Sequence, residues 1–405
     1  MTRTVITGLG VAAPNGLGHE NHWKSVLSGS TGIAPVTGFD ASGYPAALAG
    51  QIDDFTDAEH IPSRLLPQTD RSTRLGLAAA DWAFDDAGVE IGDLTDYQMG
   101  VVTSNALGGF DFTHREFRNL WNQGPAYVSV YESFAWFYAV NTGQISIRHK
   151  MRGPSAALVG EQAAGLDALG HARRTVRGGT PLVVAGGVDS AFDPWGYVSQ
   201  LAGGLVTTSA DPERGYLPFD AAASGYVPGE GGAMLVVEDA DNARARGAKQ
   251  IYGELTGYAA GFDPAPGSER GPALGRTARA AIADAGLTPA DIDVVFADGA
   301  GVPHLDAAEA EALTALFGVR GVPVTVPKAL TGRLYGGGGP LDVATALLSL
   351  RDGVVPPTHG LSGPPEAYGI DLVREARELP LRHALVLARG RHGFNSAVVL
   401  TAFDS

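Results

Sequence analysis

The chain has 405 residues and a mass of 41.8 kDa, enough for a deep core, and its 56 glycines and 25 prolines indicate many tight turns rather than disorder. It contains no cysteine, which excludes disulfides, thiolate metal sites and cysteine nucleophiles, and its ten histidines lack metal-binding spacings, so we expect no metal. A formal charge of −15 argues against nucleic acid and anionic membrane surfaces, and no apolar run is long enough to span a membrane, so we expect a cytoplasmic protein.

The N-terminal segment 4–14 is predicted to form a buried strand. Its glycines at positions 8 and 10 resemble part of a dinucleotide-binding fingerprint. However, Pro14-Asn15-Gly16 makes a turn where the helix of such a motif would have to begin. We therefore expect no nucleotide cofactor at this point of the chain.

An Ala-rich helix followed by a short apolar strand occurs twice, about half the chain apart. The helices end at Gly88 and Gly286, where a positive φ is favoured, and the strands follow at 99–103 and 293–297. Helices of this kind alternating with Val-rich runs predict α/β layers with buried sheets. We expect two similar halves, residues 1–247 and 248–405, that meet near Gly247.

Residues 110–121 are predicted to form a helix with one bulky face. Phe110, Thr113 and Phe117 are spaced i, i+3 and i+7, so they lie on one side of the helix, as an ordinary core stripe also would. The following segment, 131–141, is dense in aromatic residues, which suits a large subunit interface. Its candidate interface residues are Tyr131, Phe134, Trp136, Phe137 and Tyr138.

Residues 153–172 are predicted to form a strand of small residues that turns sharply into a helix with Gln162 at its start. The segment resembles the nucleophile motif of β-ketoacyl synthases, which place a cysteine at this point. The N–H groups and dipole of a helix N-terminus stabilise a thiolate, whereas an amide cannot form a thioester. Taken alone, Gln162 is also compatible with a polar helix cap.

Two later segments carry the same resemblance. In active ketosynthases a His-Gly-Thr-Gly-Thr segment precedes an Asp-x-x-Glu helix start, and here the matching residues 298–302 begin with Asp298. Arg333 follows Lys328 at the position of the family's second catalytic histidine. Lys328 itself is retained, and we expect it to pair with a carboxylate, Glu309 being one candidate.

The glycine loops around these positions also depart from the family pattern. Arg391 stands where a phenylalanine gate is expected, and Ser224 stands in place of the usual acidic residue. The four glycines at 336–339 precede a helix without the Lys-Ser or Lys-Thr of a phosphate loop. We expect them to allow close backbone packing beneath the site.

A glutamine in this G-x-Q-A-x-G-L-D setting resembles the chain length factor, the ketosynthase β subunit of type II polyketide synthases in antibiotic biosynthesis. The resemblance implies an α/β thiolase fold, a duplicated α/β/α/β/α sandwich. It also implies a subunit of an acyltransferase-class enzyme whose own site is degenerate at Gln162, Asp298 and Arg333. Its partners would be a ketosynthase α subunit in a heterodimer and, mostly through that subunit, a phosphopantetheinylated acyl carrier protein, with no cofactor of its own.

In chain length factors, residues at the positions of Phe110, Thr113 and Phe117 line the far end of a tunnel that holds the polyketide chain. Two phenylalanine rings there imply a moderate length, near an octaketide. Two other functions stay open. One is a malonyl carrier-protein decarboxylase that supplies the acetyl starter, with Gln162 holding the enolate oxygen, and the other is a purely structural subunit.

Overall fold

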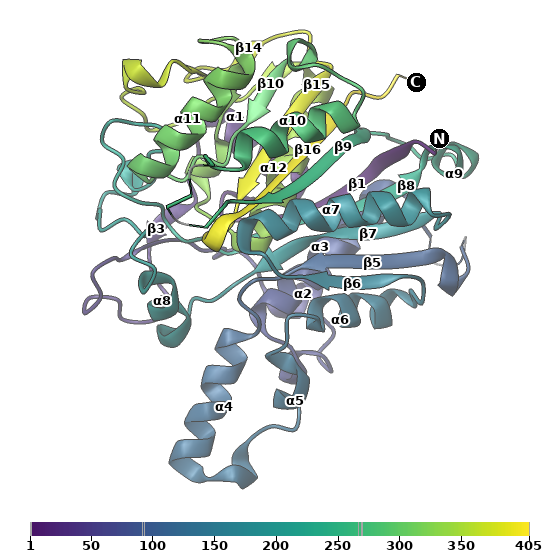
Figure 1. Cartoon of the computed structure of the whole chain (residues 1–405). Helices are drawn as coiled ribbons and strands as arrows, with labels where there is room; N and C mark the ends of the chain where they lie inside the picture. The colour runs from purple at the N-terminus through teal and green to yellow at the C-terminus, as the bar shows by residue number, and fades with distance from the viewer. Residues whose placement is uncertain (1, 91, 93, 266, 269, 405) are drawn as a thin grey trace.

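The computed structural model describes residues 2–404 except 91, 93, 266 and 269. Its main sheet has the strand order β13-β11-β10-β15-β16-β9-β1-β8-β7-β5-β6 (Figure 1). The first half of the chain contributes β1 (Thr4–Ala13), β5 (Met99–Ser104), β6 (Ser155–Leu158), β7 (Leu182–Asp189) and β8 (Gly231–Asp239). The second half contributes β9 (Gly253–Phe262), β10 (Val294–Phe296), β11 (Pro323–Thr325), β13 (Asp371–Leu372), β15 (His383–Arg389) and β16 (Phe394–Thr401).

The two halves repeat one topology. In the first, β1-β8 and β8-β7 are antiparallel and β7-β5 and β5-β6 are parallel. In the second, β9-β16 and β16-β15 are antiparallel and β15-β10 and β10-β11 are parallel. The halves meet where β1 pairs antiparallel with β9. The duplication predicted from the repeated helix and strand is therefore present in the sheet itself.

Four helices complete the layers. α3 (Arg71–Ala87) packs on β1 and β8, and α10 (Leu274–Asp284) packs on β9 and β16. α7 (Glu161–Arg177) and α12 (Gly338–Asp352) pack on each other and on strands of both halves, and α12 is buried from Gly338 to Leu350. This arrangement confirms the predicted thiolase fold, with α7 and α12 as its central layer.

Small residues explain how the outer helices approach the sheet. A Cβ on Gly10 of β1 would lie 1.8 Å from the carbonyl oxygen of Ala79 in α3, and one on Gly257 of β9 would lie 2.2 Å from that of Ala281 in α10. Gly88 caps the C-terminal end of α3 with a φ of 62°, and Gly286 follows the end of α10 with a φ of 74°. Both glycines have the positive φ that was predicted. The glycine-rich first strand is thus a packing surface, which leaves no room for a dinucleotide against it.

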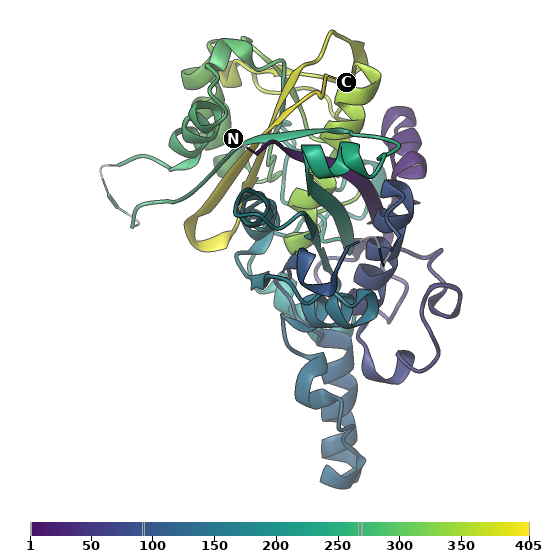
Figure 2. The ribbon, with the colours of Figure 1, turned by 90° about the vertical axis from the view of Figure 1, so that its right-hand side faces the viewer.

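One helix pair extends away from this body. α4 (Phe110–Gln123) and α5 (Glu132–Ala135) form the projection at the bottom of Figure 1, which Figure 2 shows from the side. The buried carboxylate of Glu116 in α4 accepts a hydrogen bond from the amide of Ser129 (2.8 Å), which joins α4 to the chain that returns to the body. The predicted helix of residues 110–121 is therefore present, but it lies mostly outside the layered core.

The remaining elements surround the core. They are α1 (His19–Ser28), α2 (Asp57–His60), α6 (Val140–His149), α8 (Pro194–Leu201), α9 (Ala240–Ala245), α11 (Pro303–Phe317), β2 (Gly16–Leu17), β3 (Ile33–Pro35), β4 (Leu48–Gly50), β12 (Val354–Val355) and β14 (Arg377–Glu378). Within the described part of the chain, every helix is too short or too polar to cross a membrane.

Candidate functional site

Gln162 lies at the start of a helix, directly after a sharp turn from a strand, as the sequence predicted. β6 ends at Leu158 and α7 begins at Glu161, whose φ of 52° is in the left-handed region that residues with a side chain rarely adopt. Gln162 is fully buried, and neither atom of its amide has a hydrogen-bond partner among the described residues. A buried amide, without a partner in the described part of the chain, therefore lies where the sequence resemblance expects a nucleophile.

The glycine run packs against this amide. A Cβ on Gly338 would lie 2.8 Å from the side-chain carbonyl of Gln162, and one on Gly337 would lie 2.0 Å from the carbonyl oxygen of Gly231. Residues 336–339 therefore bring the backbone close beneath the site, as expected.

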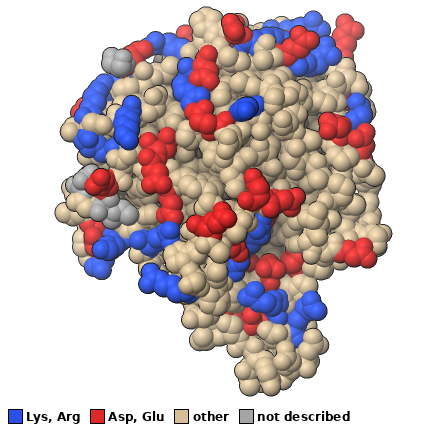
Figure 3. Space-filling model, turned by 180° about the vertical axis from the view of Figure 1, so that it is seen from behind, with Lys and Arg blue, Asp and Glu red and all other residues tan. Residues whose placement is uncertain are grey.

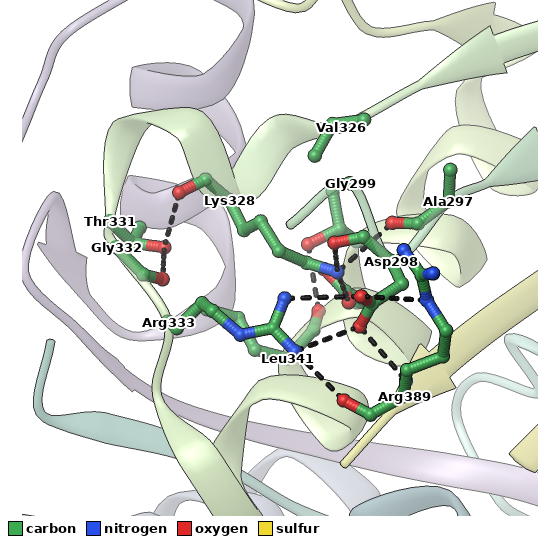
Figure 4. Close-up of polar contacts among 12 residues, drawn as sticks. Ala297, Asp298, Gly299, Val326, Lys328, Thr331, Gly332, Arg333, Leu341 and Arg389 are labelled. Atoms are coloured by element: carbon green, nitrogen blue, oxygen red, sulfur yellow. Dashed lines mark hydrogen bonds and ion pairs between the residues drawn. The ribbon is translucent and has the colours of Figure 1, made fainter. Parts of the chain in front are cut away.

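Asp298 and Arg333, which the sequence resemblance aligns with two catalytic histidines, bind each other (Figure 4). The guanidinium of Arg333 donates two hydrogen bonds to the carboxylate of Asp298, at 3.1 and 3.2 Å. Arg389, at the end of β15, adds an ion pair at 3.3 Å and a backbone hydrogen bond of 2.9 Å to the same carboxylate. Because the Asp298 and Arg333 side chains are only 1% and 5% exposed, the two replacements form one buried, charge-compensated unit.

This unit stays ionised at neutral pH. Burial would raise the pKa of the Asp298 carboxyl, but the attraction of Arg333, Arg389 and Lys328 outweighs burial and holds that pKa below its ordinary range. Burial would likewise lower the pKa of Arg333, yet Asp298 holds it well above its ordinary value. The pair therefore offers neither the proton donor nor the proton acceptor that two imidazoles would provide.

Lys328 pairs with a different carboxylate from the one expected. Its Nζ lies 2.6 Å from the carboxylate of Asp342 on α12 and donates to the carbonyl oxygens of Ala297 (3.0 Å) and Asp298 (3.2 Å). Lys328 therefore pairs with a carboxylate, as expected, but Glu309, the candidate named from the sequence, is not its partner.

Glu309 instead supports the loop that carries Asp298. Its carboxylate accepts hydrogen bonds from the amides of Asp298 (2.9 Å) and Gly299 (3.0 Å) and pairs with Arg389 at 2.8 Å. These three donors occupy the carboxylate, so Glu309 holds Asp298 and Arg389 in place.

A cavity of about 570 Å³ opens beside the ion pair, and Glu161, Tyr226, Asp298, Arg333, Arg389 and Arg391 are among the residues that line it. The side chain of Arg391 donates a hydrogen bond to the Tyr226 hydroxyl (2.9 Å), and its backbone amide donates to the Glu161 carboxylate. Burial raises the pKa of the Glu161 carboxyl. Among the described residues, Glu161 lines this cavity and its neighbour Gln162 does not.

The three residues of the predicted length gate lie around one tryptophan. Phe110 and Thr113 line a second cavity, of about 170 Å³, together with Leu107, Gly109, Trp136, Tyr138 and Trp195. Phe117 does not line this cavity within the described residues, but its ring lies 5.8 Å from that of Trp195, which is also 5.0 Å from the ring of Phe110.

Trp195 was not predicted from the sequence. Asp193-Pro194 is a typical helix start, so the beginning of α8 was detectable, but nothing local places it beside α4.

The predicted interface aromatics lie on the projection and at its base. Trp136, Phe137 and Tyr138 are 47%, 47% and 36% exposed, whereas Tyr131 and Phe134 are half-buried and their rings lie 5.9 Å apart. In Figure 3 the far end of the projection is tan, and the charged side chains gather nearer the body. Adjacent exposed aromatic side chains of this kind mark an interaction surface.

Comparison with known proteins decides the family. The model of the β-ketoacyl synthase N-terminal domain matches residues 1–243, and that of the C-terminal domain matches residues 252–362. The chain belongs to the β-ketoacyl synthase family. It is 68% identical over 400 residues to a Streptomyces coelicolor protein named as the actinorhodin polyketide β-ketoacyl synthase 2, with 98% of each chain covered. It is 54% identical over 398 residues to the tetracenomycin polyketide synthase ketoacyl synthase β subunit of Streptomyces glaucescens, covering 98% of this chain and 97% of that one.

Among solved structures, the ishigamide ketosynthase/chain length factor matches with a TM-score of 0.90 and 25% identity over the whole of both chains. A β-ketoacyl synthase from Burkholderia phymatum shares the fold, with a TM-score of 0.91 over the whole of both chains at 24% identity. Within its family the chain is a ketosynthase β subunit, or chain length factor, of the aromatic type II polyketide synthases, which confirms the resemblance found in the sequence.

The chemistry of this chain length factor follows from its side chains. Decarboxylative condensation needs a nucleophile to carry the acyl chain and neutral donors to stabilise the enolate and the tetrahedral oxyanion. The chain has an amide, a carboxylate and a guanidinium at these three positions, and the last two are bound to each other. A carboxylate also repels a developing oxyanion.

Proposed function

We propose that this chain length factor catalyses no condensation itself and limits the length of the chain that a ketosynthase α subunit builds, near an octaketide. The observation that carries the proposal is the small cavity in which Phe110 and Thr113 lie beside Trp195, with the ring of Phe117 also packed against that indole. Large rings around a small space suit the closed end of a tunnel. The Asp298–Arg333 ion pair supports the non-catalytic role.

The partner in this proposal is a ketosynthase α subunit, bound through the aromatic segment 131–141 and the neighbouring sheet edge. β6 ends the main sheet in its half, and an edge strand has unpaired backbone groups that favour pairing with another chain. The solved ketosynthase/chain length factor and the β-subunit name of the tetracenomycin relative support this assembly.

The acyl carrier protein would dock mostly on the α subunit, since a chain of charge −15 repels an acidic partner. Residues 1–247 and 248–405 would be the two halves of the subunit, because Gly247 lies in the loop between α9 and β9.

The test of length control uses Phe110→Ala and Phe117→Ala in the co-expressed pair. Removing either ring enlarges the end of the tunnel, so we expect products one or two ketide units longer at unchanged turnover by the α subunit. Product masses are compared at matched amounts of soluble complex. Arg118→Ala, an exposed change on the same helix, serves as the control and should leave product length unchanged.

The result also distinguishes length control from the alternative of a purely structural subunit. If the face were only packing, a phenylalanine-to-alanine change would destabilise the subunit by about 3 to 5 kcal/mol and reduce yield without lengthening the product. Unchanged length in both variants would rule out the gate.

The decarboxylase alternative predicts that the amide of Gln162 holds an enolate oxygen. The amide is unpartnered, but it is buried away from the large cavity and the two imidazoles are missing. We therefore expect Gln162→Ala and the unmodified chain to release equal amounts of acetyl product from malonyl-loaded carrier protein, followed by mass spectrometry. A large excess of acetyl product that depends on Gln162 would make the chain an enzyme in its own right.

A further inference from the structure

The start of α8 carries Trp195, and a single buried carboxylate fixes it. Asp193, whose side chain is 5% exposed, is the N-cap of α8 and accepts hydrogen bonds from the amides of Trp195 and Gly196, both at 3.0 Å. The first turn of α8 is therefore oriented by this side chain. Trp195 is 43% exposed, and its indole packs against rings of α4, those of Phe110 and Phe117.

The same carboxylate reaches across to the predicted gate helix. Nδ1 of His114, in α4, lies within hydrogen-bond distance of Oδ2 of Asp193, and because a carboxylate only accepts, the ring nitrogen is the donor. The imidazole also lies against the indole of Trp195, with ring centroids 6.3 Å apart. Asp193 thus joins His114 on α4 to the backbone that carries Trp195.

Other contacts, which do not involve α8, also hold α4 in place. The amide of Phe112 donates to the buried carboxylate of Asp70 (3.0 Å) at the start of α3, and Glu116 accepts from Ser129 at the far side. Among the described residues, the contact between His114 and Asp193 is the side-chain hydrogen bond that ties α4 to the start of α8. Its loss would leave α4 anchored and allow the start of α8, which carries Trp195, to shift relative to α4.

We infer that His114 is a positioning residue for chain length: through Asp193 it sets the distance of Trp195 from Phe110 and Phe117, and so the size of the cavity that Phe110 and Trp195 line. The inference rests on the proposed length control. It assigns a role in product length to a polar residue on the flank of the gate helix rather than on its bulky face.

The test compares His114→Ala with His114→Asn in the complex with the ketosynthase α subunit. An asparagine amide can place a donor near the position of Nδ1, so it should restore the bond that alanine removes. We expect the ratio of longer to normal products to rise about 2- to 10-fold in His114→Ala, the range expected for one hydrogen bond, and to return toward the original value in His114→Asn. Arg118→Ala is the matched control.

A second measurement reports on α8 directly. Hydrogen exchange of the amides of Trp195 and Gly196, followed by mass spectrometry of the intact complex, should be faster in His114→Ala and restored in His114→Asn. This readout needs no product, so it also applies if the alanine variant loses yield.

The outcomes are distinguishable from those of the proposed function. If Phe117→Ala lengthens the product while His114→Ala changes neither length nor exchange, this inference alone is wrong. If alanine and asparagine act equally, the hydrogen bond is not the cause and the inference is again overturned. If no variant on α4 changes length, the proposed length control fails with it.

Discussion

Arg333→Ala is expected to destabilise this subunit strongly, lowering the free energy of unfolding by about 3 to 5 kcal/mol. The change leaves the Asp298 carboxylate buried without its two-point partner, and Arg389, which also serves Glu309, compensates only in part. Denaturant unfolding of the purified protein, or of its complex if the subunit requires a partner, measures the loss. Arg382→Ala breaks the exposed pair with Asp404 and should have a much smaller effect.

A double-mutant cycle makes this prediction sharper. The double variant, Asp298→Ala with Arg333→Ala, leaves neither charge of the pair uncompensated. Its loss in the free energy of unfolding should therefore be smaller than the sum of the losses in the two single variants. Additive losses, or a single loss no larger than that of Arg382→Ala, would show that the pair is not a stability unit. The subunit would then have retained these residues for another reason.

The three candidate positions could be chosen from the sequence because each lies in a short local motif, and their assignment as degenerate catalytic positions stays a prediction. Gln162, Asp298 and Arg333 each lie in a segment whose glycines and caps are typical of the family. Their mutual arrangement was not predictable. Asp298 and Arg333 are 35 positions apart and meet because β10 and β11 are parallel neighbours, so the segments that follow these two strands leave the same edge of the sheet.

The residues missed by the sequence show the same limit. Arg389 lies at the end of an apolar strand and Trp195 at the start of a short helix, and neither sequence context indicates a role. The expected pairing of Lys328 with Glu309 failed for a related reason. Charge alone allows several partners, and the choice of Asp342 depends on how α12 packs beneath the loop.

The individual helices and strands were easier to predict than the order in which the strands pair. The repeated helix, its glycine end and the following strand appear in the sequence because each is a local pattern, and both copies are present in the structure. The contact of β1 with β9 joins residues about 250 positions apart, and no local signal specifies it. The projection of α4 beyond the core was also unpredicted, because the same partly apolar helix face can pack against the protein's own core or against a partner.

The remaining large effect concerns assembly. We expect Phe137→Asp to disrupt the heterodimer with the ketosynthase α subunit, weakening it by about 2 kcal/mol or more, roughly 30-fold in Kd. Phe137 is 47% exposed between Trp136 and Tyr138, with ring centroids 5.3 and 6.2 Å from theirs, so a carboxylate there would have to be buried among aromatic rings on association.

The matched control is Val319→Asp, which places the same charge on an apolar residue that is 76% exposed, between α11 and β11 in the other half of the chain. Size-exclusion chromatography of the co-expressed pairs should show a shared peak for the original and Val319→Asp chains and separate peaks for Phe137→Asp. Retention of the complex by Phe137→Asp at low micromolar concentration would mean that the aromatic segment lies outside the interface. The edge strand β6 would then be the surface left to account for pairing, and its exposed positions the next to change.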